Sequence, residues 1–403
     1  MFVGKNTAID LPSTLLRLVV IIGISLGAVY YLSMWTGDNG PDAQGFTKTP
    51  YWDFNNLWTG GRLALEGHVR HIFDMELYRP DMRRLLGLNV PNQEWSYPPS
   101  LLLLAVPLAS LPALPAYIVW TLGSVLLLHF AVRPYKLPMM FHLAIILCPA
   151  VFINAMFGQN GSFISALFIA GLFYAPRKPV LAGICFGVMT VKPHLGILIP
   201  FALIASGNWK AFISAGVTTV TLFIATGLLF GFSVWSDFLH STQPMMQAFM
   251  EKPFPHPYQA NTVTGFILAR GFGAGLPLAY LAQAILTLCA IVAVIVLWRK
   301  DDIHEYKKIA LTLGLAIVAT PYGYIYDMVG ISFAVALAIY LTRPSPWWAV
   351  LALLWMFPIF NHHLILSVHM NFGIIVILLG LLVMWKLPLR ETISRNGLVP
   401  TAS

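Results

Sequence analysis

The sequence has few charged residues. Aspartate, glutamate, lysine and arginine make up 10% of its 403 residues, whereas soluble domains carry about 25%. Hydrophobic residues account for 58% of the chain. This composition excludes an ordinary soluble domain and indicates an all-α polytopic membrane protein, because helices satisfy their own backbone hydrogen bonds in lipid.

Cysteine is also scarce. Cys148, Cys185 and Cys289 all lie in apolar segments, where cysteine is most often a small core residue. Three such residues predict neither a disulfide framework nor a metal site. The adjacent His362 and His363 have no cysteine or carboxylate at ligand spacing. No P-loop, zinc or nucleophile-elbow motif is present, so we expect no metal and no cofactor.

Acidic residues are fewer than basic ones. The chain has 16 Asp and Glu against 24 Lys and Arg, a formal net charge of +8. It contains no basic run or aromatic-basic module, which argues against nucleic acid as a partner. Basic loops on the cytoplasmic side of a bilayer would account for part of the excess. A lipid phosphate substrate would account for more.

Apolar segments follow one another through the chain. They predict about eleven to thirteen transmembrane helices, some short or broken, in one integral-membrane domain over residues 1–403. The segments cover residues 15–35, 100–111, 116–132, 139–157, 162–174, 181–205, 211–232, 276–298, 309–322, 329–341, 347–360 and 364–385. The first lacks a small-residue cleavage pattern and is expected to be a retained helix.

Two loops, residues 36–95 and 233–275, are too long to be simple connectors. The first mixes leucines with arginines, a pattern typical of short amphipathic helices in the headgroup layer. Its end, Trp95–Pro99 (WSYPP), predicts the start of the next helix, because proline suits a first helical turn and forbids an earlier one.

The distribution of basic residues predicts the topology. Lys5 and Arg17 accompany the first span and place the N-terminus in the cytoplasm. The two long loops and residues 322–327 and 361–363 then lie outside. The basic residues of the last third lie inside: Arg299, Lys300, Lys307, Lys308, Arg343, Lys386, Arg390 and Arg395. Four basic residues of the middle third do not fit a simple alternation: Arg133, Lys136, Arg177 and Lys178. The topology of residues 133–205 therefore stays open.

Asp53 stands out because it lies between Trp52 and Phe54, at the expected rim of the bilayer. An ionised carboxylate there must be hydrated or paired, since hydrocarbon opposes it by several kcal/mol. It could act as a general base facing the outside. Equally, it could cap a helix in the loop or be a solvated loop aspartate, since Asp before an apolar-periodic stretch is a capping signal.

Lys192-Pro193 interrupts an apolar run. A lysine at such a place is costly unless it faces a wet cavity, which favours a functional role over snorkelling to an interface. His194 follows directly and, taken alone, is more often a satisfied histidine of a helix bundle.

Further polar residues are expected on the outer side with Asp53. They are Asn55, Asn56, Arg62, Gln159, Asn160, Tyr322, Tyr324, Tyr326 and Asp327. Together with Asp53 and Lys192 they supply a carboxylate, cations and hydrogen-bonding groups suited to sugar hydroxyls and a leaving phosphate. Each also has a simpler interpretation. The tyrosines could be aromatic-belt anchors, residues 158–161 (GQNG) a plain turn, and Asp327 an arginine partner or a helix end.

Five stretches in order resemble glycosyltransferase family 87, whose members use polyprenol-phosphate sugars. They are YWDFNNLWTGGRLALEGHVRHIFD, WSYPPSLLLLAVPLASLP, FGQNGSFISALF, LAGICFGVMTVKPHLGILIPFALIASGNWKAF and ATPYGYIYDM. The resemblance runs from about Asp53 to Asp327. It implies a GT-C fold whose first extracytoplasmic loop carries the catalytic acid, here Asp53, and it places the family's KP motif on Lys192-Pro193.

The resemblance also implies the chemistry. Family members transfer mannose or a related sugar from a polyprenyl phosphate to a glycolipid or glycan acceptor, typically with inversion. We therefore expect a metal-independent enzyme of a bacterial inner membrane, with its site facing the periplasm. Asp53 would be the base, while Lys192, Arg62 and His194 would bind the donor phosphate. Asn55, Asn56, Gln159, Asn160, Tyr322, Tyr326 and Asp327 would bind sugar or acceptor.

One segment departs from the family pattern. Mannosyltransferases of the family often have a Ser-Pro-x-Ser-Trp stretch followed by paired histidines, where this chain has Thr320–Asp327 (TPYGYIYD). Asp327 would repel a phosphate and could bind sugar hydroxyls instead. Two other interpretations stay open: a transporter or lipid flippase, although no internal repeat is evident, and a catalytically inactive scaffold for envelope assembly.

Overall fold

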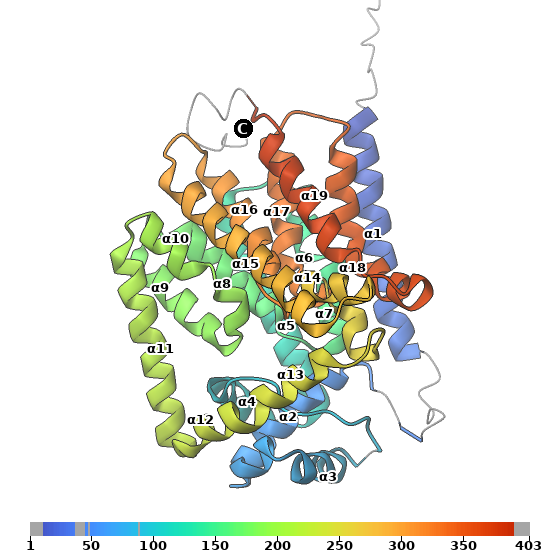
Figure 1. Cartoon of the computed structure of the whole chain (residues 1–403), viewed down its shortest axis with the longest axis vertical. Coiled ribbons are helices and arrows are strands. Elements are labelled where there is room, and N and C mark those ends of the chain that lie inside the picture. The colour runs from blue at the N-terminus through green and yellow to red at the C-terminus, as the bar shows by residue number, and fades with distance from the viewer. Residues whose placement is uncertain (1–10, 37–44, 47–48, 88, 391–403) are drawn as a thin grey trace, which may run out of the picture.

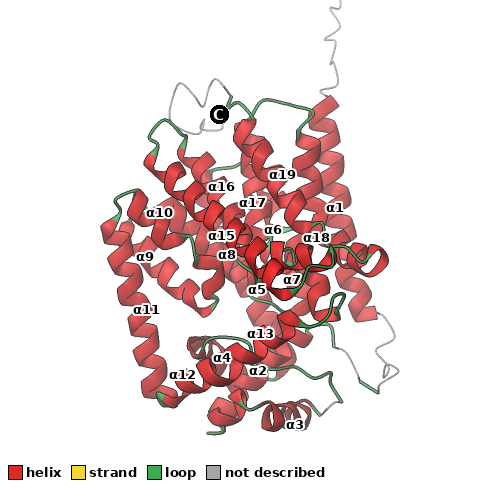
Figure 2. Cartoon of the chain, in the orientation of Figure 1, coloured by secondary structure: helices red, strands yellow, loops and turns green. Residues whose placement is uncertain are grey.

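A computed structural model describes residues 11–36, 45–46, 49–87 and 89–390. The described part is helical (Figures 1 and 2) and contains only two isolated β-bridges in place of strands. The predicted fold class, an all-α polytopic membrane protein, is confirmed. Lys5 and Arg395 lie outside the described residues.

Six segments among the described residues are long and apolar enough to cross a membrane. Five are single helices: α1 (Leu11–Thr36), α5 (Ala113–Val132), α11 (Trp209–Phe230), α15 (Leu276–Arg299) and α18 (Trp348–Val368). The sixth consists of α6 (Met139–Ile146) and α7 (Pro149–Phe157), which are separated where Pro149 begins the second helix.

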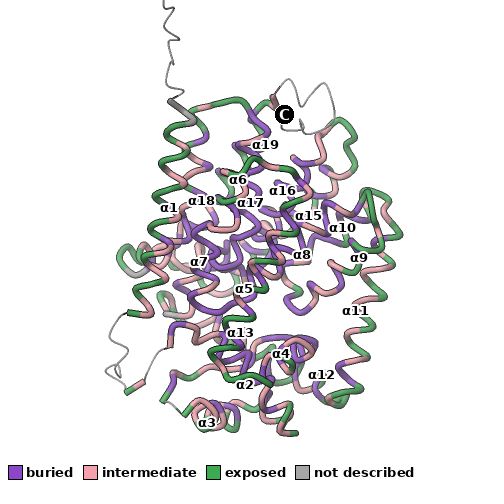
Figure 3. Tube along the Cα trace, turned by 180° about the vertical axis from the view of Figure 1, so that it is seen from behind, coloured by how far each residue is buried: buried purple, intermediate pink, exposed green. Residues whose placement is uncertain are grey.

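Shorter helices complete the bundle. They are α4 (Leu102–Ala109) after the turn η2 (Pro99–Leu101), α8 (Gly161–Tyr174), α9 (Pro179–Val188), α10 (Ile199–Ala205), α16 (Glu305–Val318), α17 (Val329–Leu341) and α19 (Gly373–Lys386). Helix α17 is buried almost along its whole length. The outer helices α1 and α11 instead expose many large apolar side chains (Figure 3), as expected of surfaces that face lipid.

Residues 179–205 form a helical hairpin. Gly183 of α9 lies against Ser214 of α11, and Gly187 lies against Thr218, so α9 and α11 run in the same direction. Helix α10 must therefore return the chain to the end where α9 began, and the Asn208 amide accordingly donates to the Ala175 carbonyl at 2.6 Å. The interruption expected at Lys192 is confirmed, but the chain turns back there instead of crossing.

The hairpin resolves the topology of the middle third. Tyr135 packs against Phe173 and Tyr306, and Arg177 binds Glu305 with distances of 2.5 and 3.0 Å. These contacts bring residues 133–136, 173–178 and 305–308 to one end of the bundle, which also holds the end of α19. The four basic residues that break the predicted alternation (Arg133, Lys136, Arg177 and Lys178) thus join the other basic residues.

Most helices of the two long loops gather at the opposite end, whereas α14 lies higher in the bundle (Figure 1). The first loop forms α2 (Trp52–Leu65), η1 (Val69–Phe73) and α3 (Met75–Leu86), and the second forms α12 (Ser233–Asp237), the π-turn η6 (Phe238–Thr242), α13 (Gln243–Glu251), η7 (Pro257–Asn261) and α14 (Gly265–Gly271). Helix α3 fits the expected amphipathic pattern. Helix α2 is largely buried, because Gly60 and Gly61 let Trp95 and the Ala105 backbone approach closely.

One predicted boundary is wrong. The sequence places a break between two spans at residues 361–363, whereas α18 continues through them to Val368. Asn361 is buried and its amide donates to the carbonyls of Ala260 and Thr262, so this polar residue binds the second loop without ending the helix. The chain leaves the helix at His369, which adopts the left-handed conformation.

Candidate active site

The carboxylate of Asp53 is held by two amide side chains from distant parts of the sequence. Its Oδ1 accepts a hydrogen bond from Gln93 Nε2 at 3.1 Å, and its Oδ2 accepts one from Gln159 Nε2 at 2.7 Å. Asp53 lies in the first turn of α2, where the helix dipole favours a negative charge. The N-cap of this helix is Tyr51, so Asp53 is not its cap residue.

Burial raises the pKa of Asp53 from its ordinary 3.8 to about 6. The hydrogen bond from Gln159 and the positive charge of Lys192 act in the opposite direction and keep the pKa below neutrality. The carboxylate is therefore ionised at pH 7, yet it binds protons more strongly than an exposed aspartate does. A general base working near neutral pH needs this combination.

Lys192 and Asp327 form a buried ion pair. Lys192 lies at the tip of the α9–α10 hairpin, between η4 (Met189–Val191) and η5 (Pro193–Gly196), and Asp327 ends the turn η8 (Ile325–Asp327). Lys192 Nζ lies 2.6 Å from Asp327 Oδ1, and the two side chains are 5% and 0% exposed. The ammonium also lies 5.0 Å from the ring centre of Tyr326.

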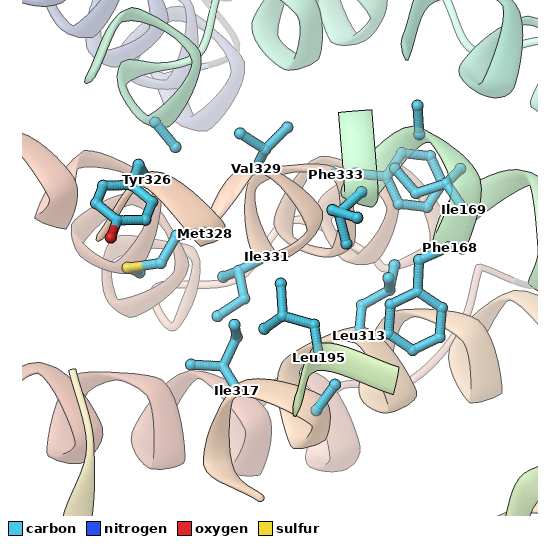
Figure 4. Close-up of a cluster of buried hydrophobic side chains, with 14 of the residues drawn as sticks. Phe168, Ile169, Leu195, Leu313, Ile317, Tyr326, Met328, Val329, Ile331 and Phe333 are labelled. Atoms are coloured by element: carbon cyan, nitrogen blue, oxygen red, sulfur yellow. The ribbon is translucent and has the colours of Figure 1, made fainter. Parts of the chain in front are cut away.

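Apolar packing fixes both partners of this pair. Leu195 follows Lys192 in the hairpin tip and lies beside Leu313 and Ile317 of α16 in a cluster of buried side chains (Figure 4). Tyr326 and Met328, which flank Asp327, lie at one end of the same cluster. Neither charge can move into water without disturbing this core.

The GQNG turn connects Asp53 to the ion pair. Gly158 has a φ of +71° and lies so close to Phe54 that a Cβ atom would stand 2.4 Å from the Phe54 Cβ. Gly161 begins α8 and lies against the Tyr326 carbonyl, only 2.0 Å from where its own Cβ would be. Between the two glycines, Gln159 reaches Asp53. The turn therefore sets the distance between α2 and η8.

We expect Gly161→Ala to lower the free energy of unfolding by about 1–3 kcal/mol, because the added methyl group would push η8 away from α8. Activity should fall with stability, since η8 carries Asp327. Gly216→Ala is the matched control: no atom of the described residues lies within 4 Å of a Cβ there, so this change should stabilise α11 by about 0.5–1 kcal/mol. Thermal unfolding in detergent would compare the two, and equal effects would contradict the packing argument.

Aromatic residues surround these groups. Trp52 packs against Phe157, Phe157 against Tyr326, and Tyr326 stacks on Tyr324 with ring centres 5.1 Å apart. The Tyr324 hydroxyl donates to Tyr258, which brings the second long loop to the site. His194 packs against Tyr322, with ring centres 5.9 Å apart. The side chains that surround the site thus come from both loops, the GQNG turn, the hairpin tip and η8.

The comparisons with known proteins give one match. The model of glycosyltransferase family 87 matches residues 95–321, more than half of the chain. The chain belongs to glycosyltransferase family 87. No curated protein and no solved structure matches it.

The family 87 match covers only part of the site. Gln159, Asn160, Lys192 and His194 lie within the matched residues, whereas Asp53 and Asp327 lie outside them. Membership in family 87 makes this membrane protein a glycosyltransferase. The roles of individual side chains rest on their geometry.

Three predicted site residues of this family 87 protein have other partners in the structure. Asn55 donates to Thr49 at 2.7 Å, while Asn56 donates to the Glu94 carbonyl and accepts from Tyr78. Arg62 lies two and a half turns beyond Asp53 on α2, about 14 Å along the axis, and binds Glu66 at 3.2 Å. The structure does not bring Arg62 to the ion pair.

The sequence did not reveal four polar residues of the site. Gln93 binds Asp53, Tyr97 donates to Gln159 Oε1 at 3.1 Å, and Asn154 and Ser162 flank the GQNG turn. Tyr97 belongs to the WSYPP stretch, and Asn154 and Ser162 adjoin FGQNG, so both motifs marked the correct regions. Gln93 had no comparable signal, because a lone glutamine in a polar loop is ordinary.

Proposed function

We propose that this protein transfers a sugar, mannose or a related hexose, from a polyprenyl-phosphate donor to a glycolipid or glycan acceptor, with inversion. The supporting observation is the arrangement around the GQNG turn: the Asp53 carboxylate on one side and a buried lysine on the other. Direct displacement at an anomeric carbon needs a base for the acceptor and a cation for the leaving phosphate.

In the proposed reaction, Asp53 takes the proton from the acceptor hydroxyl as its oxygen forms a bond to the anomeric carbon. The bond from that carbon to the phosphate oxygen breaks, and its electron pair leaves with the polyprenyl phosphate. Lys192 then offsets the charge that develops on the phosphate. His194 lies two residues after Lys192 in the hairpin tip, and its Nε2 is buried without a hydrogen-bond partner among the described residues, so it would serve as a second group for the phosphate.

The charge distribution supports an outward-facing site. Outside the two long loops, basic residues concentrate at the end of the bundle opposite α2, which the positive-inside rule assigns to the cytoplasm. Asp53 and both long loops would then face the periplasm of a bacterial inner membrane, where a polyprenyl-phosphate sugar displays its head group.

The proposal is tested with purified protein in proteoliposomes. We expect transfer of radiolabel from polyprenyl-phosphate mannose, or from the glucose or galactose analogue, to an extracted glycolipid fraction, and no transfer from the corresponding nucleotide sugars. Transfer from a nucleotide sugar alone would contradict the donor assignment. Movement of the lipid between leaflets without transfer would favour a flippase.

The activity should depend on pH through Asp53. The base must be ionised, and its folded pKa is about 6, so kcat/KM should fall about tenfold per unit as the pH drops below 6. Because the folded pKa exceeds the ordinary 3.8, the folded state binds the proton more tightly, and stability should decline as the pH rises from about 4 to 6. A kcat/KM profile that stays flat between pH 5 and 7 would contradict the assignment.

A further inference from the structure

Several buried polar atoms beside the GQNG turn have no hydrogen-bond partner in the described part of the chain. Among the described residues, Asn160 lacks a hydrogen bond at both Nδ2 and Oδ1, and the same is true of Asn154 Nδ2, Ser162 Oγ and Asp327 Oδ2. The four residues are only 1–4% exposed. Buried polar groups without partners oppose folding. Their concentration in one region therefore indicates groups that a ligand satisfies.

These atoms come from segments that touch. Asn154 Oδ1 accepts from the Ser162 backbone N–H, which ties the last turns of α7 to the start of α8. The position of a Gly161 Cβ would be 2.9 Å from Asn154 Nδ2 and 2.0 Å from the Tyr326 carbonyl, so Asn154 lies beside the segment that carries Asp327. Asn160 stands between Gln159, which holds Asp53, and Gly161, which meets Tyr326.

The chemistry of this set favours neutral hydroxyls over phosphate. A phosphate offers only acceptor atoms and negative charge, which the free oxygen Asp327 Oδ2 would repel. A sugar hydroxyl both donates and accepts, so it can donate to Asp327 Oδ2 or Asn160 Oδ1 and accept from Asn160 Nδ2, Asn154 Nδ2 or Ser162 Oγ. The other Asp327 oxygen stays bound to Lys192. The lysine therefore keeps its proposed role toward the leaving phosphate.

The position of these polar residues indicates that they bind the donor sugar and not the acceptor. In an inverting displacement, the donor sugar lies between the base and the cation that receives the leaving phosphate. The polar set lies between Gln159, which is bound to Asp53, and Asp327, which is bound to Lys192. We infer that Asn154, Asn160, Ser162 and Asp327 form the subsite that recognises the hydroxyls of the donor hexose, an inference that rests on the proposed function.

Binding measurements with the bare lipid and with its sugar-bearing forms test this inference. Full-length protein in nanodiscs is titrated with bare polyprenyl phosphate and with the mannose, glucose and galactose forms of the same lipid. We expect the wild type to bind one sugar-bearing form more tightly than the bare lipid. Asn160→Ala and Ser162→Ala should each reduce that preference about tenfold, leave the affinity for bare lipid unchanged, and not lower the unfolding temperature of the free protein.

Thr59→Val is the matched control. Thr59 is fully buried and its hydroxyl also lacks a partner among the described residues, but it lies six residues beyond Asp53 on α2. Its substitution should leave the sugar preference intact. If the Asn160 and Ser162 variants lost affinity equally for bare and sugar-bearing lipid, these residues would bind the phosphate. That result would overturn this inference and leave the proposed function unaffected. Failure of the wild type to bind either lipid would overturn the proposed function as well.

Discussion

Asp53→Asn should reduce sugar transfer by about two to four powers of ten, as loss of a general base does in other enzymes. Asparagine has the same shape: its oxygen can still accept from Gln159, and its NH2 can donate to Gln93 once the Gln93 amide rotates and presents its unpartnered oxygen among the described residues, so the site should stay assembled. What it lacks is the capacity to take the acceptor proton. The acid limb of the pH profile should disappear together with the activity.

Stability separates this effect from misfolding. Burial raises the pKa of Asp53 and thus disfavours its ionised form, so a neutral side chain should not lower the unfolding temperature at pH 7.5. Asp74→Asn is the matched control in the same loop, because Asp74 caps α3 by accepting from the backbone of Glu76 and Leu77. Asparagine caps equally well. Near wild-type turnover of Asp53→Asn would remove the assignment of the base.

Lys192→Met should lower the free energy of unfolding by about 3–5 kcal/mol, because it leaves the Asp327 carboxylate buried without its partner. The same substitution should abolish most of the activity, because no other cation of the described residues binds Asp327. Denaturant titration in mixed micelles measures the first effect, and transfer from the polyprenyl-phosphate donor measures the second.

The double variant Lys192→Met/Asp327→Leu tells the two roles apart. Replacing both members of a buried ion pair by apolar groups of similar size is often close to neutral for stability, so we expect most of the lost stability to return. Activity should not return, since neither the cation nor the carboxylate is restored. A double variant that is stable and active would show that the pair only holds the hairpin tip against η8.

Several features of this protein follow from the sequence alone. The low charge and repeated apolar segments determine a helical membrane protein, because only helices or closed barrels satisfy the backbone in lipid. Pro179 and Pro193 mark the start of α9 and the tip of the hairpin, since proline begins helices and interrupts them. The unusual residues Asp53, Lys192 and Asp327 are also recognisable from the sequence, because charges in apolar surroundings need a reason.

Other features depend on three-dimensional packing. Whether residues 181–205 cross the membrane or turn back cannot be derived from hydropathy, because both arrangements bury the same apolar residues. The polar residues Asn361–His363 are typical of a loop, although a buried amide bonded to Ala260 and Thr262 allows α18 to continue. The role of Gln93 was equally hidden, because its partner Asp53 lies 40 residues earlier.

The sequence by itself determined which groups could perform the chemistry: one carboxylate near the membrane surface, one lysine before a proline, and the polar GQNG turn. Only the tertiary structure decided that they meet. Two glycines let α2 and η8 pack against the ends of the same turn, and the hairpin brings Lys192 to Asp327, 135 residues later in the chain. Such contacts depend on shape and close packing between distant segments, which local sequence patterns do not encode.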